Sequence, residues 1–369
     1  MRKLRIGVAG LGRAFQVMAP AFADPRVELA GAADPRPGVR FPARAFPSVE
    51  ALCRSPDVDV VYVATPHQFH AEHACLAAQH GKHVLVEKPM ALGLDECRRM
   101  IEAARTAGVR LVVGHSHSFD LPVLRTGELI RSGAYGRLRM ITALNFTDFL
   151  YRPRRPEELD TSRGGGAIFN QAAHQVDVAR ILSPGRILSV RAQTGKWDPA
   201  RPTEGAYSAL LTFEDGAFAS LTYSGYAHFD SDELMGWVGE MGGRKDPAHY
   251  GVARKSLDDR QKYAPRKLQP QTHHQHFGFL IASCERADLR PQPDGVMIYG
   301  DEEKRLDPLP APKIPRVEVI DELYEAVIND KPPLHSGEWG MATLEVCLAM
   351  LESAREGKEV QLAQRPKSA

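Results

Sequence analysis

The fold of the first part of this chain is decided by the stretch Leu4-Arg5-Ile6-Gly7-Val8-Ala9-Gly10-Leu11-Gly12. Its apolar residues predict a buried strand, and Gly10 and Gly12 permit a tight turn into a helix. Backbone N–H groups at such a turn approach a pyrophosphate closely. Phe15 occupies the third position of the usual Gly-x-Gly-x-x-Gly pattern, so a purely structural turn explains these residues about as well as a nucleotide site does.

A carboxylate after the next apolar run favours the nucleotide interpretation. That run covers residues 27–33, and Asp34 follows it, 22 residues after Gly12. The spacing is close to the ~20 residues expected for a carboxylate that accepts hydrogen bonds from the adenosine ribose. Asp34 would repel a 2′-phosphate, which favours NAD over NADP. Arg36 would attract one, so NADP stays possible.

Apolar runs and helical stretches alternate up to about residue 117. The further runs cover residues 58–64, 84–86 and 109–113. Continuous apolar strands suit a sheet that is covered on both faces, and the intervening helices require crossovers that make the strands parallel. We therefore expect an α/β, doubly wound (Rossmann) sheet and assign residues 1–118 to a dinucleotide-binding domain.

The pattern changes after residue 118. Strands are predicted over residues 138–149, 187–194, 207–213 and 218–226, and helices over 121–131, 168–182, 317–328 and 341–355. This order indicates an α+β domain over residues 119–369, with an open-faced, mainly antiparallel sheet and helices on one face. We expect this domain to bind the substrate and to form a homodimer or homotetramer through the uncovered face.

Residues 228–276 form a long polar stretch with little periodicity. The stretch is longer than an ordinary connection, so it is either a functional flap or a mobile insertion.

Composition excludes several classes of protein. The 369 residues carry 47 Lys and Arg against 46 Asp and Glu, which gives no global attraction to nucleic acid or to an anionic membrane. We find no signal peptide and no apolar run of the ~18 residues that a membrane span needs. The five cysteines are scattered, which argues against a disulfide framework and favours a reducing cytoplasm.

Polar residues follow two of the predicted parallel strands. Thr65-Pro66-His67 follows one, and Glu87-Lys88-Pro89 follows the other. Ligands of open α/β sheets bind outside the carboxyl ends of the strands. There the Lys88 ammonium could hydrogen-bond a substrate hydroxyl and help to remove its proton. The alternative is a solvated lysine at a strand end.

The segment from Arg163 to Asp177 leads through three glycines into a predicted helix. Regular helical spacing places Asn170, His174 and Asp177 on one stripe. His174 can exchange a proton near neutral pH, and a neighbouring carboxylate or amide can fix its tautomer. A capped surface helix with an ordinary His–Asp contact is the alternative.

Two groups of histidines suggest a metal site at first sight. They are His67, His70 and His73, and His273, His274 and His276. Neither group is accompanied by cysteines or by a compact set of carboxylates, so we expect no metal.

Taken together, the glycine turn, Asp34, Thr65-Pro66, Glu87-Lys88-Pro89 and the glycine-rich turn before His174 resemble the Gfo/Idh/MocA family of nicotinamide-dependent oxidoreductases. The likeness covers nearly the whole chain. It implies that Lys88 is the catalytic or substrate-polarising lysine, that His174 is the second catalytic residue, and that the open sheet mediates oligomerisation. Many members carry Asp four residues before the histidine; here that position is Asn170, so a role that needs a carboxylate falls to Asp177 or is absent.

Within the family, residues 145–156 and 171–177 look like those of bacterial 4,5-dihydroxyphthalate dehydrogenases (phthalate 4,5-cis-dihydrodiol dehydrogenases), which oxidise a ring cis-dihydrodiol that bears two carboxylates. Guanidinium groups bind carboxylates in two-point fashion. Expected substrate-binding residues are therefore Arg152, Arg154, Arg155, Arg163 and Asn170. Glu157, Glu158 and Asp160 lie in the same loop and could pair with these arginines instead.

The sequence thus predicts an NAD(P)-dependent dehydrogenase that acts on a ring secondary alcohol. The cofactor-binding candidates are Gly10, Gly12, Arg13, Asp34, Arg36, Thr65, Pro66, His67, His70, Glu87 and Lys88. Three alternatives remain: a sugar or cyclitol dehydrogenase, a glycoside hydrolase that uses NAD, and a non-catalytic binding protein that responds to nucleotides.

Overall fold

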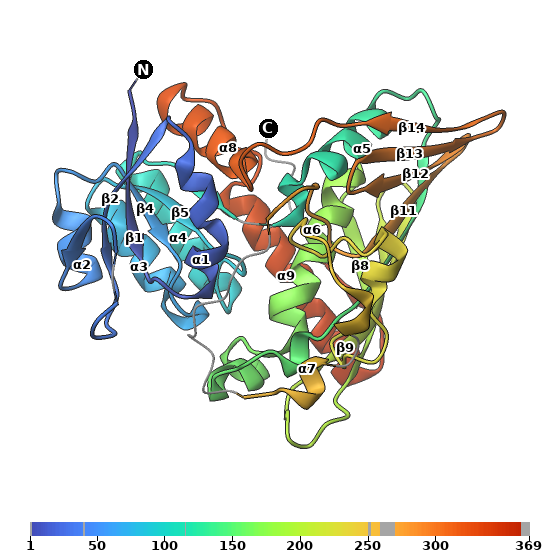
Figure 1. The fold of residues 1–369 in the computed structure, drawn as a ribbon, viewed down its shortest axis with the longest axis horizontal. Coiled ribbons are helices and arrows are strands. Elements are labelled where there is room, and N and C mark those ends of the chain that lie inside the picture. The colour runs from blue at the N-terminus through green and yellow to red at the C-terminus, as the bar shows by residue number, and fades with distance from the viewer. Residues whose placement is uncertain (1, 40, 115, 250–251, 259–269, 363–369) are drawn as a thin grey trace. The chain divides into compact units, whose positions relative to one another are not determined.

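The computed structural model describes residues 2–39, 41–114, 116–249, 252–258 and 270–362. The chain divides into two compact units (Figure 1). The first contains the described residues before 115 and returns for Lys313–Leu344, and the second contains the remainder. The expected second domain, residues 119–369, included Lys313–Leu344, which the structure places in the first unit. These residues belong there because helix α8 (Val317–Ile328) buries Val319, Ile320 and Leu323 and hydrogen-bonds to Arg2 through Tyr324.

The first unit is built on a six-stranded sheet with the order β3-β2-β1-β4-β5-β6, and its strands all run parallel, as predicted. Its strands are β1 (Leu4–Ala9), β2 (Val27–Ala33), β3 (Arg44–Phe46), β4 (Val60–Val63), β5 (His83–Val86) and β6 (Leu111–Val113). Strand β3 was not predicted, because only Phe46 of its three residues is buried and no apolar run marks it.

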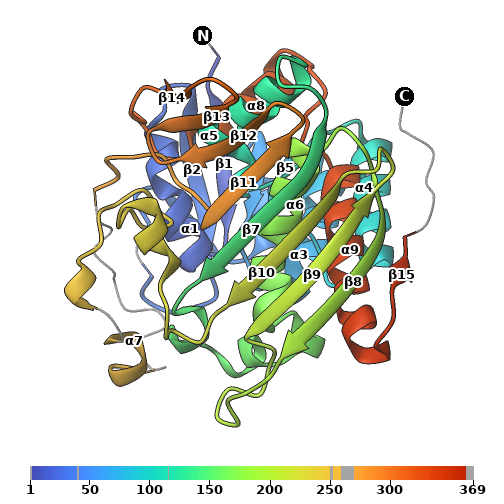
Figure 2. The ribbon, with the colours of Figure 1, turned by 90° about the vertical axis from the view of Figure 1, so that its right-hand side faces the viewer.

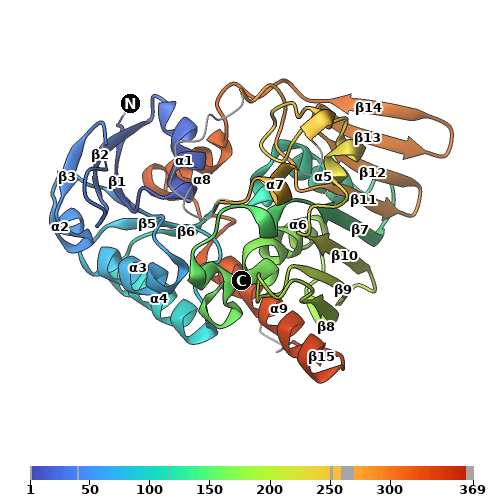
Figure 3. The ribbon, with the colours of Figure 1, turned by 60° about the horizontal axis from the view of Figure 1, so that its bottom comes forward.

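Helices cover both faces of this sheet (Figure 3). They are α1 (Arg13–Met18), α2 (Val49–Arg54), α3 (His70–Gln79), α4 (Leu94–Ala107) and α8, and α9 (Gly337–Glu356) begins in this unit. All four residues of β4 are buried, which is why the central strands carry continuous apolar runs rather than an alternating pattern.

The second unit is built on a nine-stranded sheet with the order β14-β13-β12-β11-β7-β10-β9-β8-β15. Its strands are β7 (Leu138–Phe146), β8 (Ile187–Gly195), β9 (Ala206–Phe213), β10 (Phe218–Ser224), β11 (Phe279–Cys284), β12 (Ala287–Gln292), β13 (Gly295–Gly300), β14 (Lys304–Pro308) and β15 (Val360–Gln361). Neighbours pair antiparallel except β7 and β10, which run parallel, so the sheet is mainly antiparallel as predicted. Strands β11–β14 were missed: β12 does alternate, but a proline within a run argues against a strand, and short apolar runs such as that of β13 do not identify a strand by themselves.

Helices α5 (Leu121–Arg131) and α6 (Ala173–Leu182) pack on one face of this sheet, and the other face is turned toward the viewer in Figure 2. That other face carries apolar side chains: Leu210 of β9 is 46% exposed and Phe218 of β10 is 41% exposed.

The long segment 228–276 is anchored to the second unit where the structure describes it. Ser231 is fully buried, and its hydroxyl donates to Asn145 on β7. A short helix, α7 (Val252–Lys255), follows, whereas residues 250–251 and 259–269 lie outside the described part. Within the described residues, no helix has the length and apolar character needed to cross a membrane.

Candidate active site

The glycine turn of the first unit leaves open space beside the backbone. Gly10 has a φ of 92°, and a Cβ added there would lie 2.8 Å from the carbonyl oxygen of Ala64. A Cβ on Gly12 would instead meet no described atom within 4 Å beyond its chain neighbours. The first glycine is therefore required by the turn itself, and the second keeps free a space that fits a pyrophosphate approaching the backbone.

Asp34 lies at the end of β2 beside this turn. Its Oδ2 accepts from the Leu11 N–H at 2.8 Å and from Arg36 Nη2 at 2.7 Å, and its Oδ1 accepts from Arg36 Nε at 2.8 Å. Burial alone would raise the pKa of Asp34, but the hydrogen bonds from Arg36 and Leu11 outweigh it and hold the pKa below its usual value. The carboxylate therefore stays ionised, and the guanidinium is bound to it.

The loops after β4 and β5 are joined by His70. Its ring is fully buried, with Nε2 2.9 Å from the Thr65 carbonyl oxygen and Nδ1 2.9 Å from the Pro89 carbonyl oxygen. Both ring nitrogens are engaged with the protein backbone. We therefore assign His70 to holding the two loops together rather than to the expected contact with the cofactor.

Glu87 and Lys88 differ in exposure although they are adjacent. Glu87 is buried, and its carboxylate accepts a hydrogen bond from the Tyr62 hydroxyl, whereas Lys88 is half-buried. Arg13, Thr65, Pro66 and His67 are half-buried as well. Because all strands of this sheet are parallel, the predicted cofactor residues gather at the carboxyl edge of one sheet.

His174 lies in a cluster of rings in the second unit. Its ring centroid is 4.9 Å from that of His117 and 4.8 Å from that of Phe277, and its Nδ1 is 3.4 Å from Ser116 Oγ. The ring is buried among side chains from three segments far apart in the sequence. Its position suits proton transfer, because a histidine held by its neighbours presents one fixed orientation.

His117, which lies beside His174, and Glu240, which lies beside His117, were not predicted from the sequence. His117 Nδ1 lies 2.6 Å from Asp120 Oδ2, and its Nε2 lies 3.5 Å from Glu240 Oε1. Burial lowers the pKa of the His117 imidazole, but the charges of Asp120 and Glu240 outweigh it and raise the pKa above its usual value. His117 follows the last parallel strand, as Thr65 and Glu87 follow theirs, and that position was an available signal. No signal in the sequence pointed to Glu240.

Two polar side chains form hydrogen bonds with the backbone of the glycine-rich turn before His174. Asn170 Nδ2 donates to the carbonyl oxygens of Gly164 and Gly166, at 3.2 and 2.8 Å. Glu204, which is buried, accepts from the Ile168 N–H at 3.1 Å. Asn170 therefore stabilises the glycine-rich turn.

The predicted stripe of Asn170, His174 and Asp177 is altered by the local helix type. Ile168–Ala172 forms a π-helix, and the α-helix begins only at Ala173. The wider turn changes the direction of Asn170 relative to α-helical spacing. Asp177 is buried, accepts from the Ser118 hydroxyl and lies 3.8 Å from Arg180 Nη1.

The four candidate arginines differ in their partners. Arg152 lies 2.7 Å from Asp148 and 3.6 Å from Glu240, and Arg155 lies 3.2 Å from Glu157 and 3.4 Å from Glu158. Arg154 is largely buried over the Phe149 ring, 3.7 Å from Glu158. Arg163 is exposed and forms no ion pair within the described ranges. The loop carboxylates Glu157 and Glu158 thus pair with two of the four arginines, and Arg152 pairs with carboxylates outside that set.

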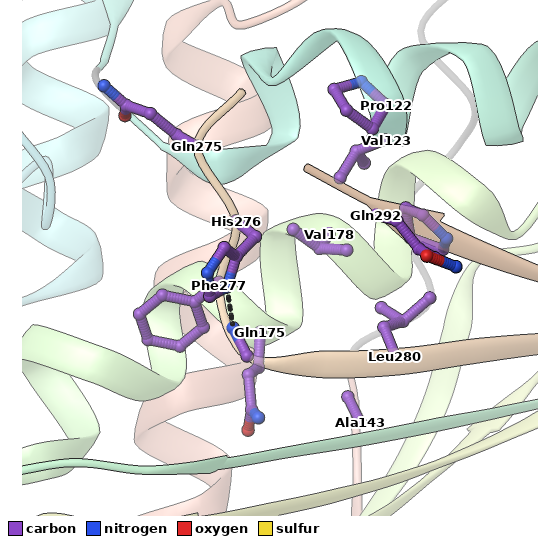
Figure 4. Close-up of a pocket in the computed structure, with 12 residues that line it drawn as sticks. Pro122, Val123, Ala143, Gln175, Val178, Gln275, His276, Phe277, Leu280 and Gln292 are labelled. Atoms are coloured by element: carbon purple, nitrogen blue, oxygen red, sulfur yellow. Dashed lines mark hydrogen bonds between the residues drawn. The ribbon is translucent and has the colours of Figure 1, made fainter. Parts of the chain in front are cut away.

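The second unit contains a pocket of about 430 Å³, which includes solvent at its mouth (Figure 4). Val123 of α5 and Val178 of α6 point toward it, and Phe277 belongs both to its lining and to the ring cluster. His276 also lines the pocket, but both of its ring nitrogens contact the backbone. Nε2 lies 2.8 Å from the Val238 carbonyl oxygen, and Nδ1 accepts from the Gly278 N–H at 3.0 Å. The pocket therefore offers mainly amide and aliphatic groups.

The described residues contain no group of three or more His, Cys, Asp or Glu side chains arranged to hold a metal ion. The rings of His67 and His70 pack edge to face, and His73 Nδ1 lies 3.1 Å from Thr65 Oγ1.

Comparisons with known proteins agree with this architecture. Residues 4–115 match the Gfo/Idh/MocA oxidoreductase family with its NAD-binding Rossmann fold, and residues 123–243 match a Gfo/Idh/MocA C-terminal domain. A 1-carboxy-3-chloro-3,4-dihydroxycyclohexa-1,5-diene dehydrogenase of Comamonas testosteroni is 48% identical over 95% of each chain.

Solved structures extend the likeness. A protein of Bordetella bronchiseptica RB50 described as a dehydrogenase is 45% identical, with a TM-score of 0.92 over 98% of this chain and 100% of its own. The WlbA dehydrogenase of Bordetella pertussis, solved with NADH and UDP-GlcNAcA, is 25% identical, with a TM-score of 0.70 over 99% and 100%. This chain is therefore a member of the Gfo/Idh/MocA family of oxidoreductases, and its first unit is an NAD-binding Rossmann domain.

Proposed function

We propose that this enzyme oxidises a ring cis-dihydrodiol that carries a carboxylate. The observation that carries the proposal is the 48% identity, along 95% of both chains, to a dehydrogenase named for a carboxylated dihydroxycyclohexadiene. Such a substrate loses a hydride from carbon and a proton from its hydroxyl, and bound NAD supplies the hydride acceptor. The product gains aromaticity, which draws the reaction toward oxidation. A phthalate 4,5-dihydrodiol, with two carboxylates, is the narrower candidate.

We assign the removal of the substrate hydroxyl proton to Lys88 and His174. Lys88 is half-buried and provides an ammonium that hydrogen-bonds the hydroxyl oxygen. His174 is the proposed proton acceptor, since its ring is enclosed by His117 and Phe277. Asp177 is proposed to support the helix that carries His174, through its contacts with Ser118 and Arg180.

We propose that arginines of the loop before the glycine-rich turn bind the substrate carboxylate. Two of these arginines are the proposed ligands: Arg163 is exposed and forms no ion pair in the described ranges, and Arg154 lies over the Phe149 ring, 3.7 Å from Glu158. A planar guanidinium binds a carboxylate through two hydrogen bonds, which gives both charge and direction.

A substrate screen tests this function. NADH formation is followed at 340 nm with mono- and dicarboxylated ring dihydrodiols, an uncharged ring dihydrodiol, inositols, sugars and levoglucosan. The highest kcat/KM is expected for a carboxylated dihydrodiol. A higher kcat/KM for an inositol or a sugar would replace this proposal with the cyclitol or sugar alternative.

We further propose that the enzyme forms a homo-oligomer through the uncovered face of the nine-stranded sheet. Leu210 and Phe218 place exposed apolar area on two neighbouring strands of that face. Leu210→Glu with Phe218→Glu should convert the assembly to monomers in sedimentation measurements. Leu334→Glu, at an equally exposed leucine of the first unit, is the control and should leave the mass unchanged.

A cytoplasmic location is also proposed. All five cysteines are free, which is the usual state in a reducing compartment.

A further inference from the structure

We propose that His117 is a positioning residue, clamped between Asp120 and Glu240, whose ring sets the orientation of His174. The inference rests on the proposed function only in taking His174 as the group that accepts the proton.

Both nitrogens of His117 face carboxylates. Nδ1 lies 2.6 Å from Asp120 Oδ2, and Nε2 lies 3.5 Å from Glu240 Oε1, and the side chain is 1% exposed. Carboxylates only accept hydrogen bonds, so this arrangement places a proton on each ring nitrogen. An imidazolium held at both ends cannot rotate about its Cβ–Cγ bond without breaking an ion pair.

The ring held in this way is one wall of the His174 site. The two imidazoles meet edge to face, with an interplanar angle of 70°, and Phe277 closes the other side at 4.8 Å. Phe277 also lies 5.0 Å from His117, so the three rings contact one another. The uncharged Ser116 hydroxyl contacts His174 Nδ1. Among the described residues, the charged and titratable groups that face His117 include Asp120, Glu240 and His174.

Glu240 comes from the long segment 228–276 and is itself fixed. Burial would raise the pKa of Glu240, but the hydrogen bond with His117 and the charges of Arg152 and His117 keep the pKa well below its usual value. Arg152 Nη2 lies 3.6 Å from Glu240 Oε2 and is oriented by Asp148 at 2.7 Å. The Glu240 carbonyl oxygen accepts from the His276 N–H at 3.3 Å, which ties this residue to the neighbour of Phe277.

This geometry gives the described part of the segment a role in chemistry. It supplies the acid that orients His117, and it ends directly before Phe277, the aromatic ring on the other side of His174. Loss of the Glu240 charge would remove the ion pair at Nε2 and weaken the hold on the His117 ring. A displacement of about 1 Å at a reacting group costs up to ~10²-fold in rate.

The test compares Glu240→Gln, which keeps the size of the side chain, with the matched control Glu233→Gln at an exposed acid of the same segment. Imidazole nitrogens are labelled with ¹⁵N in the full-length protein, and the signals of His117 and His174 are assigned by difference with His117→Gln and His174→Gln. In the unmodified protein, His117 should carry protons on both nitrogens at pH 7. In Glu240→Gln, the His117 titration should move to lower pH and the His174 signals should shift, whereas Glu233→Gln should leave both unchanged.

Kinetics add a second readout. Glu240→Gln should lower kcat on the order of tenfold, alter the pH profile of kcat, and leave NADH affinity unchanged. His117→Gln should lower kcat similarly, and the double variant should be no worse than either single one, because the two residues act through one contact.

The inference is overturned if His117 is singly protonated at pH 7 in the unmodified protein, a measurement that needs no variant to fold. It is equally overturned if the His174 signals are the same in Glu240→Gln and Glu233→Gln. The ring measurements use no substrate. If carboxylated dihydrodiols are not oxidised but the His174 signals respond to Glu240→Gln, the proposed function fails and the positioning role stands.

Discussion

Arg36 binds the carboxylate of Asp34 at two points, with Nε 2.8 Å from Oδ1 and Nη2 2.7 Å from Oδ2. The two residues that sequence analysis set against each other, one favouring NAD and the other NADP, are thus partners in one ion pair. The guanidinium is neutralised by the acid that repels a 2′-phosphate, so the pair as a whole favours NAD.

This pairing predicts the outcome of removing the acid. Asp34→Ala should raise affinity for NADPH relative to NADH on the order of tenfold, because Arg36 then lacks its carboxylate and can bind a phosphate. Asp34→Asn, which keeps an acceptor for the Leu11 N–H, should do the same with less effect on the glycine turn. Fluorescence titration with both dinucleotides provides the measurement. Tighter binding of NADPH than of NADH by the unmodified enzyme would contradict the preference for NAD.

The two glycines of the turn should respond differently to alanine. Gly10→Ala places a side chain at a φ of 92° and close to the Ala64 carbonyl oxygen, so it should cost roughly 1–3 kcal/mol of stability. Gly12→Ala has a permitted φ of −78° and no described atom in its way, so its melting temperature should stay unchanged while NADH affinity falls. Thermal unfolding and NADH titration together separate the two effects. Normal NADH binding by Gly12→Ala would remove that glycine from the cofactor site.

The proposed proton-transfer residues should be needed for turnover but not for folding. Lys88→Ala and His174→Ala are each expected to lower kcat by ~10²–10⁴-fold, which is the usual contribution of such groups. NADH affinity and the melting temperature should remain near those of the unmodified enzyme. Near-normal kcat in Lys88→Ala would exclude that lysine from the mechanism.

Replacing Asn170 with Asp should lower the stability of the protein by an amount that depends on pH. Asn170→Asp turns a donor toward the Gly164 and Gly166 carbonyl oxygens into a carboxylate, which should cost about 1–3 kcal/mol when it is ionised. Repulsion by these oxygens raises the folded-state pKa of the new carboxyl above its unfolded value. Folding then binds a proton, so stability is greatest below the unfolded pKa and falls as pH rises through the folded pKa.

The melting temperature of Asn170→Asp should therefore lie further below that of the unmodified enzyme at pH 8 than at pH 5. Asn170→Ala loses the same hydrogen bonds without gaining a charge, so its deficit should be equal at the two pH values, and its kcat should fall less than that of His174→Ala. Equal deficits for Asn170→Asp at both pH values would show that the amide does not face the two carbonyls.

The effect on KM of replacing a loop arginine should depend on whether that arginine is already paired with a carboxylate. Arg154→Met and Arg163→Met are expected to raise KM for a carboxylated dihydrodiol steeply at one or both positions and to reduce its advantage over an uncharged diol. Arg155→Met should change KM little, because Arg155 is already paired with Glu157 and Glu158. NAD affinity should stay constant throughout. Unaltered KM in the variants of all four arginines, including Arg152, would end the assignment of a substrate carboxylate to this loop.

Features that depend on local pattern could be predicted from the amino-acid sequence. Near-continuous apolar runs at 4–9, 27–33 and 84–86 predicted buried parallel strands, because strands covered on both faces need apolar residues at most positions. The glycine turn and Asp34 were predictable for the same reason, since backbone conformation and a fixed spacing specify them. Strands β11–β14 were not, because the proline in β12 argues against a strand and the short apolar run of β13 does not identify one by itself.

The surroundings of His174 and His117 follow from tertiary packing alone. His117 lies more than a hundred residues before Glu240 and Phe277 in the chain, and nothing in the composition of any one segment indicates that they meet. The π-helix at Ile168–Ala172 likewise changes the direction of Asn170 without any mark in the helical pattern. Periodicity reports which face of an element is buried, whereas the partner of a buried charge is set by how the elements pack, and that packing placed two carboxylates on the two nitrogens of one histidine.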